Sequence, residues 1–116
     1  MIVDIFPKNV QAHHDLSVTN AAEDHPRSGS CWLVGGDAYN PGGSVAYLQV
    51  FDAAAADVTL GSTVPVYTQA LTALVATPIE PPRPVLCRTA LSYAVTATRT
   101  GNGAPASACD LSLVYA

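Results

Sequence analysis

Charge is scarce in this chain of 116 residues: only 12% are Asp, Glu, Lys or Arg, about half the usual share of ~25%. Lysine occurs once, at Lys8. A free-standing soluble protein normally carries many mixed surface charges, whereas protein interfaces tend to exclude Lys and Glu. The composition therefore favours an oligomer or a subunit of a larger assembly. A monomer with a polar but uncharged surface stays open as the alternative.

Other absences exclude whole classes of function. The formal charge of −4 and the five scattered basic residues provide no basic face for nucleic acid. No apolar run reaches the roughly 18 residues of a membrane span, and the start, "MIVDIFPKNVQAHHD", has no signal-peptide pattern. We therefore expect no nucleic-acid partner, no membrane and no secretion by that route.

Catalytic and metal-binding patterns are missing as well. No serine lies in a Gly-x-Ser-x-Gly motif, and "GGDAYNPGG" lacks the lysine of a phosphate-binding loop. His13, His14 and Asp15 are the one cluster of metal-ligand types, but adjacent residues of an extended chain point to opposite sides. The sequence predicts no enzyme, no catalytic residue, no cofactor and no metal site.

The three cysteines, Cys31, Cys87 and Cys109, cannot all pair within one chain. Their gaps of 55 and 21 intervening residues match no zinc-binding spacing. Each cysteine lies in or beside an apolar strand pattern, where an unpaired thiol behaves as a small hydrophobe. Buried thiols in a reducing cell are therefore favoured over a disulfide.

What the chain does contain is a series of short strand patterns separated by turn signals. The patterns are "CWLVGGDAY", "VAYLQVFD", "STVPVYTQALTALVA", "VLCRTALSYAVTATRT" and "CDLSLVY", and the last two are expected to form a hairpin. Between them, the alanines of residues 53–56 have room for one helical turn, with Asp52 as a possible N-cap. Such spacing predicts an all-β fold, an antiparallel β-sandwich resembling a jelly roll.

Residues 1–30 differ from the rest, since they hold all three histidines and only short apolar pieces. We interpret them as an extended N-terminal arm with at most one short strand, attached to a sandwich domain of residues 31–116.

The strand at residues 45–51 has large apolar groups on both faces. If the core takes Leu48 and Val50, then Val45, Tyr47 and Phe51 form an apolar stripe on the outside, which would mark an interaction surface. The opposite assignment, with the aromatic residues in the core, is equally open. Such a strand is either central in the sandwich or buried against another subunit.

Three segments also carry a family resemblance. "YLQVFDAAAADVTLGSTVPV", "LSYAVTATRTGNGAPAS" and the final "DLSLVYA" resemble small virion-associated structural proteins of tailed bacteriophages and prophages, including capsid decoration and cement proteins. The likeness covers about residues 31–116. The chain departs from the family pattern at "TPIEPPRPVLCRT", where that pattern has a glycine-rich apolar loop.

The resemblance implies a structural protein assembled in the cytoplasm of a bacterial host and located in the virion, with no catalytic residues. The first hypothesis is a homo-oligomer, for example a trimer, that decorates the capsid by binding the major capsid protein. The interface candidates are Val45, Tyr47, Phe51 and, in the arm, Ile2, Ile5 and Phe6. The alternative is a tail-tip or spike adhesion module, in which Trp32, Tyr39 and Tyr47 would stack on host glycan.

Overall fold

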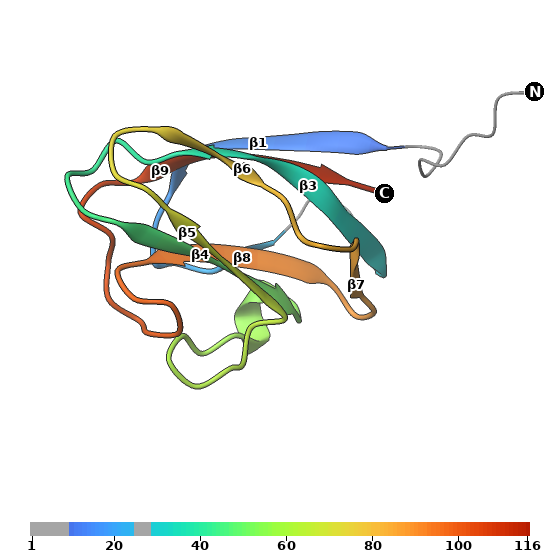
Figure 1. Ribbon diagram of the computed structural model, residues 1–116. Helices are drawn as coiled ribbons and strands as arrows, with labels where there is room; N and C mark the ends of the chain where they lie inside the picture. Colours follow the sequence, from blue (N-terminus) through green and yellow to red (C-terminus); the bar gives the residue numbers. More distant parts are fainter. Residues whose placement is uncertain (1–9, 25–28) are drawn as a thin grey trace, which may run out of the picture.

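The computed structural model describes residues 10–24 and 29–116 (Figure 1). Within these ranges the chain is almost entirely β-structure, with a single 3-10 turn, η1 (Ala55–Asp57). The strands are β1 (Gln11–Val18), β2 (Glu23–Asp24), β3 (Cys31–Tyr39), β4 (Ala46–Asp52), β5 (Tyr67–Leu71), β6 (Ala76–Ile79), β7 (Val85–Cys87), β8 (Leu91–Thr96) and β9 (Cys109–Tyr115).

The strands form two antiparallel sheets that pack face to face. Sheet A has the order β1-β9-β3-β6, with the short β7 also paired to β3, and sheet B has the order β2-β8-β4-β5. The chain crosses between the sheets repeatedly, so most neighbours in a sheet are distant in sequence. With β7 set aside, this is the strand order of an eight-stranded jelly roll. The predicted all-β, jelly-roll-like sandwich is confirmed.

The core between the sheets follows the alternation of the strands. In β9 every second side chain is buried, and Leu111 and Leu113 are fully enclosed. In β4 the residues Leu48 and Val50 face the core. This answers which face of the strand meets the core, a question that the sequence left open. Each large aliphatic side chain enclosed in this way contributes about 1.5–3 kcal/mol relative to an exposed one.

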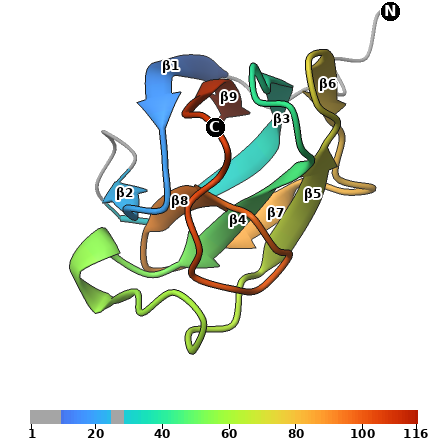
Figure 2. The ribbon, with the colours of Figure 1, turned by 90° about the vertical axis from the view of Figure 1, so that its left-hand side faces the viewer.

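Sheet B is covered on its outer side by two loops of the same chain. Figures 1 and 2 show the segment joining β4 to β5 on the side of sheet B away from sheet A. Gln49, on that outer side, donates hydrogen bonds to Thr96 Oγ1 at 2.7 Å and to the carbonyl of Gly101, in the β8–β9 loop, at 3.0 Å. All six residues of β8 are consequently buried. Of the two alternatives that the sequence allowed for this strand, the first is therefore correct: β4 is a central strand of the sandwich, and its own chain covers both of its faces.

The helical turn expected in the alanine run is present as η1, but its cap differs from the prediction. Asp52 accepts hydrogen bonds from the backbone of Thr89 at 2.8 Å and of Ala90 at 3.5 Å. The backbone N–H of Ala55, at the start of η1, donates instead to the carboxylate of Asp24 in β2, at 2.6 Å. The cap therefore comes from another strand, which local spacing does not reveal.

Two other expectations are corrected. Residues 11–18 and 23–24 belong to the sheets as β1 and β2, and Val18 is part of the core, so the boundary expected at residue 30 is wrong for these segments. Their partners, β9 and β8, come from the far end of the chain, so the local sequence gives no sign of the pairing. The hairpin expected from the last two patterns is also absent, because β8 lies in sheet B and β9 in sheet A.

Candidate functional site

The outer side of sheet A is the one broad sheet surface that loops leave uncovered among the described residues, and we call it the open face. Strand registers place the following residues on it: His14 of β1; Asp110, Ser112 and Val114 of β9; Trp32, Gly35, Asp37 and Tyr39 of β3; and Ala76 and Pro78 of β6. Because β3 carries an irregularity between Leu33 and Gly35, Trp32 and Tyr39 point to the same side despite their odd separation.

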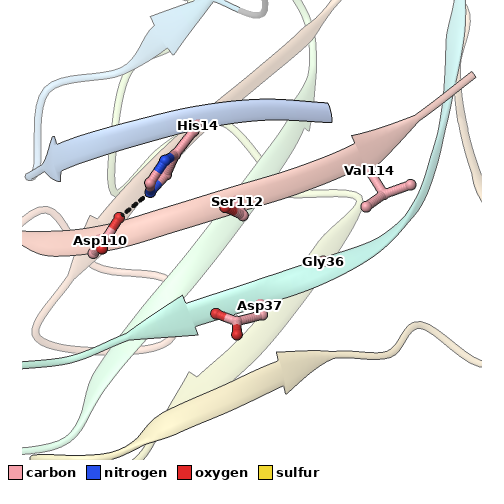
Figure 3. Close-up of a pocket in the computed structure, with 6 residues that line it drawn as sticks. All are labelled: His14, Gly36, Asp37, Asp110, Ser112 and Val114. Carbon is pink, nitrogen blue, oxygen red and sulfur yellow. Dashed lines mark hydrogen bonds and ion pairs between the residues drawn. The ribbon is translucent and has the colours of Figure 1, made fainter. Parts of the chain in front are cut away.

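A hollow of about 430 Å³ lies in the middle of the open face (Figure 3). Gly36 of β3 is one of the residues that line it, and it contributes no side chain beside β9. Gly36 has φ +144°, and a Cβ there would collide with the backbone carbonyl of Ser112. Any other residue would push β3 away from β9, so the glycine permits the close approach of these two strands beside the hollow.

The polar groups of the hollow come from three adjacent strands. His14 Nε2 lies 2.6 Å from Asp110 Oδ1, an interaction drawn in Figure 3. Ser112 stands opposite His14 on one side and opposite Asp37 on the other. His14 directs Nε2 to the carboxylate and not to the serine, so the arrangement is not a Ser-His-Asp relay. Within the described ranges, no three His, Cys, Asp or Glu side chains are placed to hold a metal ion.

Two aromatic residues of β3 stand on the same face as the hollow. Trp32 is 44% exposed and Tyr39 is 42% exposed, and Gly36 and Asp37 of the hollow lie between them along the strand. Leu16 of β1 is exposed to 71%. Of the described residues that the strand registers place on this face, three are acidic or histidine residues, His14, Asp37 and Asp110, and His14 and Asp110 are paired with each other. The open face is therefore apolar at its margins and weakly charged at its centre.

The apolar character continues from Tyr39 onto one end of the sandwich, where three exposed residues form what we call the apolar tip: Val45, Leu74 and Val75. The buried Asn40 holds the tip together. Its side-chain amide donates to the carbonyls of Ser44 at 2.9 Å and Leu71 at 3.0 Å, and its backbone exchanges hydrogen bonds with the 74–75 segment. Leu74 is 62% exposed and has φ +63°, a conformation that non-glycine residues adopt at a cost.

The structure separates the interface candidates named from the sequence. Val45 is exposed at the apolar tip, whereas Tyr47 is half-buried on the outer side of sheet B, with the Arg99 guanidinium 5.2 Å from its ring centroid. Phe51 is fully buried and therefore unavailable to a partner, because the outer side of sheet B is covered. Ile2, Ile5 and Phe6 lie outside the described residues. Sequence reasoning missed Leu74, which it placed in a strand.

A second polar cluster lies at one edge of the interior, on the opposite side of β1 from His14. The Tyr93 hydroxyl donates to Asp15 Oδ2 at 3.0 Å and lies 2.9 Å from His13 Nε2. Glu23 Oε2 is enclosed and receives no hydrogen bond from the described residues. A hydrogen bond shared with Asp15, together with burial, raises the pKa of Glu23 to about 7, and the same shared bond lowers the pKa of Asp15. Below about pH 7 Glu23 therefore keeps its proton and can share it with the Asp15 carboxylate.

Comparisons with known proteins give no relative: no family model, no curated protein and no solved structure matches the chain. Among the described residues there is also no helix with the length and apolar character needed to cross a membrane.

Proposed function

We propose that this chain is a structural protein of a bacteriophage particle, a capsid decoration protein that binds the major capsid protein through the open face of sheet A. The observation that carries the proposal is the asymmetry of the sandwich. The chain covers the outer side of sheet B with its own loops and leaves the outer side of sheet A bare, with Trp32 and Tyr39 exposed on it. The choice of a bacteriophage particle as the partner is based on the sequence resemblance.

The composition of the open face fits a protein partner. Aromatic residues are enriched at the centres of protein interfaces, and charged residues are depleted there. An exposed patch of apolar and aromatic groups on a chain so poor in charge would be poorly solvated alone. Jelly rolls recur in viral capsid proteins, although a fold does not by itself establish a function.

The apolar tip extends the proposed contact around the end of the sandwich. Leu74 and Val75 are hydrogen-bonded to Asn40, the residue after Tyr39, and Asn40 also binds the carbonyl of Ser44, which precedes Val45. One partner surface can therefore cover both regions. On a symmetric shell each subunit makes the same modest contact, and a homo-oligomer multiplies it by raising the effective concentration of the neighbouring sites. The N-terminal residues 1–9 are proposed to add a further contact through Ile2, Ile5 and Phe6.

The test is decoration of particles assembled without this chain, followed by sedimentation and quantification of the bound protein. Trp32→Ala and Tyr39→Ala should each weaken binding by about tenfold or more, as expected when an aromatic anchor is removed. Val64→Ser is the matched control, because Val64 is also exposed but lies in the loop between β4 and β5. Undiminished binding by the two aromatic variants would overturn the assignment of the open face.

Deletion of residues 1–9 tests the arm separately. The deletion has to stop there, because β1 begins at Gln11 and belongs to sheet A. A folded variant that still saturates the particles at the normal concentration would remove the arm from the proposal. A copy number set by the capsid lattice supports decoration, and a copy number set by the tail or a single vertex counts against it.

A second function, binding of host glycan, is favoured by one specific observation. Trp32 and Tyr39 stand on the same face as a hollow that offers imidazole, carboxylate and hydroxyl groups. Exposed aromatic rings beside such groups are suited to stack on sugar rings while hydrogen bonds orient the hydroxyls. Binding of the purified protein to a glycan array, lost in Trp32→Ala and accompanied by no affinity for undecorated particles, would establish this function in place of the first.

A further inference from the structure

Strands β3 and β7 place two of the three cysteines directly opposite each other. Their antiparallel register pairs Cys31 with Cys87, Trp32 with Leu86 and Leu33 with Val85. Both sulfur-bearing side chains are almost completely buried, with exposed fractions of 2% and 0%, and both are thiols. The burial expected from the sequence is confirmed, but the pairing of these two residues was not foreseen.

The backbone pairing brings these residues within reach of a disulfide. Trp32 and Ala116 exchange both of their backbone hydrogen bonds, at 2.8 and 2.9 Å, so Trp32 directs its backbone groups toward β9. Alternate residues direct these groups to opposite edges, so Cys31 directs its own toward β7. Residues opposed in this way have Cα atoms about 5.5 Å apart. Disulfides span Cα separations of about 4.4–6.8 Å, with a mode near 5.5–6 Å.

The remaining adjustment is small and falls on a segment able to make it. Opposed Cβ atoms lie about 4.5–5.5 Å apart, whereas a disulfide needs about 3.5–4.5 Å. β7 has only three residues, pairs with β3 alone and lies off the main strand order of sheet A. Such a short peripheral strand opens and shifts at lower free energy than the central strands.

We propose that Cys31 and Cys87 form a cross-strand disulfide when the protein meets an oxidising medium containing a low-molecular-weight disulfide such as oxidised glutathione. One cysteine, as the thiolate, attacks a glutathione sulfur and releases glutathione thiolate, leaving a mixed disulfide. The second cysteine then attacks the protein sulfur of that mixed disulfide and releases the second glutathione. Two protein thiols lose two electrons and two protons, and one oxidised glutathione becomes two reduced molecules.

The surroundings of the pair determine when this happens. Burial, together with the neighbouring Cys31, raises the pKa of the Cys87 thiol to about 12, so the reactive thiolate is rare while β7 is in place. Exchange therefore waits for β7 to open, and oxidation should be slow in the native state. In a reducing cytoplasm the pair stays reduced. The protein would gain its cross-link only after leaving that compartment.

The cross-link would fasten β7 to β3 and close a loop of 55 intervening residues. Cross-linking so long a segment restricts the unfolded chain, and we expect the oxidised protein to melt roughly 5–15 °C above the reduced protein. The site does not depend on which partner the open face binds.

The test is incubation of the purified full-length protein with oxidised glutathione, followed by alkylation, intact mass and peptide mapping. We expect a product lighter by two hydrogen atoms, a single Cys31–Cys87 cross-linked peptide, and Cys109 still alkylated. Mild denaturant should accelerate the reaction. Cys109→Ala is the matched control, since Cys109 pairs with Val18 at another place in sheet A, and this variant should oxidise like the parent.

Several results would overturn the proposal. They are glutathione adducts on both cysteines without a cross-link, a cross-link that involves Cys109, or thiols that stay reduced even when β7 is opened by denaturant. Because the mapping uses the unaltered protein, it does not depend on whether Cys31→Ala or Cys87→Ala folds. Where these two variants fold, each should stop at a single glutathione adduct on the remaining cysteine of the pair.

Discussion

The hydroxyl of Tyr93, on β8 of sheet B, donates a 3.0 Å hydrogen bond to Oδ2 of Asp15, on β1 of sheet A. The tyrosine ring lies in the core and is 1% exposed, so this phenol joins the two sheets through the interior. His13 Nε2 lies 2.9 Å from the Tyr93 hydroxyl oxygen, and burial raises the Tyr93 pKa, which keeps the hydroxyl protonated as a donor. This bond attaches the edge strand β1 to the opposite sheet.

Tyr93→Phe should therefore destabilise the fold. The variant retains the ring but leaves Oδ2 of the partly buried Asp15 carboxylate without the phenol as a donor, which costs about 1–3 kcal/mol. Urea denaturation followed by tryptophan fluorescence measures the change. Tyr115→Phe is the comparison, because its hydroxyl donates to the exposed Gln11 at 2.8 Å and its loss should cost less than about 1 kcal/mol. Equal losses in the two variants would contradict a special role for the Tyr93 bond.

The carboxyl pair Asp15 and Glu23 makes stability depend on pH. The folded-state pKa of Glu23 is raised from 4.5 to about 7, so its contribution is complete below pH 4.5 and is lost as the pH rises through about 7. The lowered pKa of Asp15 acts in the opposite sense, but only in acid below its ordinary value. His13, Asp24 and Tyr93 are the other titratable groups around the pair.

Between pH 5 and pH 8 the melting temperature should therefore fall. Both carboxyl groups are partly exposed, and after solvent screening the loss is about 1 kcal/mol, or roughly 4 °C for a domain of this size. Glu23→Gln should remove most of this slope, because an amide at this position does not titrate and offers Asp15 a donor at every pH. A wild-type melting temperature that stays level or rises over the same interval would refute the shared proton.

Local patterns in the sequence specified the all-β class and the two-residue repeat along β4 and β9, because burial on one face repeats every second residue, but they left open which face of β4 meets the core. They could not specify what covers the other face. Phe51 belongs to an exposed stripe in one of the two assignments that the sequence allows, yet two loops enclose the outer side of sheet B and bury it. β1, with the sequence "QAHHDLSV", has too few apolar residues to be recognised as a strand, and its place depends on the distant β9.

The chain reversal between β7 and β8 shows the same limit. "VLCRTALSYAV" reads as one continuous strand, and neither glycine nor proline marks residues 88–90, where the chain leaves sheet A for sheet B. Within the candidate site, Trp32 and Tyr39 were identifiable as aromatic residues of a strand pattern. The sequence did not show that the two side chains lie on the same face of the sheet, because this depends on the irregularity of β3 near Gly35.

Asn40 should be the most sensitive polar residue at the tip end of the sandwich. Its side-chain NH₂ group donates two hydrogen bonds, and its side-chain oxygen, Oδ1, accepts the backbone N–H of Gly42 at 2.9 Å. Asn40→Ala leaves these buried groups without partners, so we expect a loss of about 3 kcal/mol in the free energy of unfolding. Asn20→Ala removes an exposed bond to the Asn102 carbonyl and should change stability by less than about 0.5 kcal/mol. Similar values for both variants would contradict this role.

Ser92 presents the reverse case. Its hydroxyl is fully buried in β8 and has no hydrogen-bond partner among the described residues. Because the desolvated hydroxyl gains nothing in return, Ser92→Ala should leave stability unchanged or raise it by up to about 1 kcal/mol. Thr96→Val is the contrasting variant, since the Thr96 hydroxyl accepts from Gln49 and donates to the Thr98 carbonyl, both at 2.7 Å. It should be destabilising, and a destabilised Ser92→Ala would show that the hydroxyl has a partner after all.

Leu74 tests whether the apolar tip serves the fold or a partner. The residue combines 62% exposure with φ +63°, so its side chain adds little packing while its backbone conformation costs about 1 kcal/mol. Asn tolerates that conformation better than Leu, and Leu74→Asn should therefore retain or slightly raise stability while weakening attachment to particles. Leu74→Ala keeps the unfavourable backbone and should weaken attachment without the gain in stability. If Leu74→Asn lowers the free energy of unfolding by more than about 1 kcal/mol, the leucine stabilises the sandwich itself. Its exposure would then be no evidence for a partner.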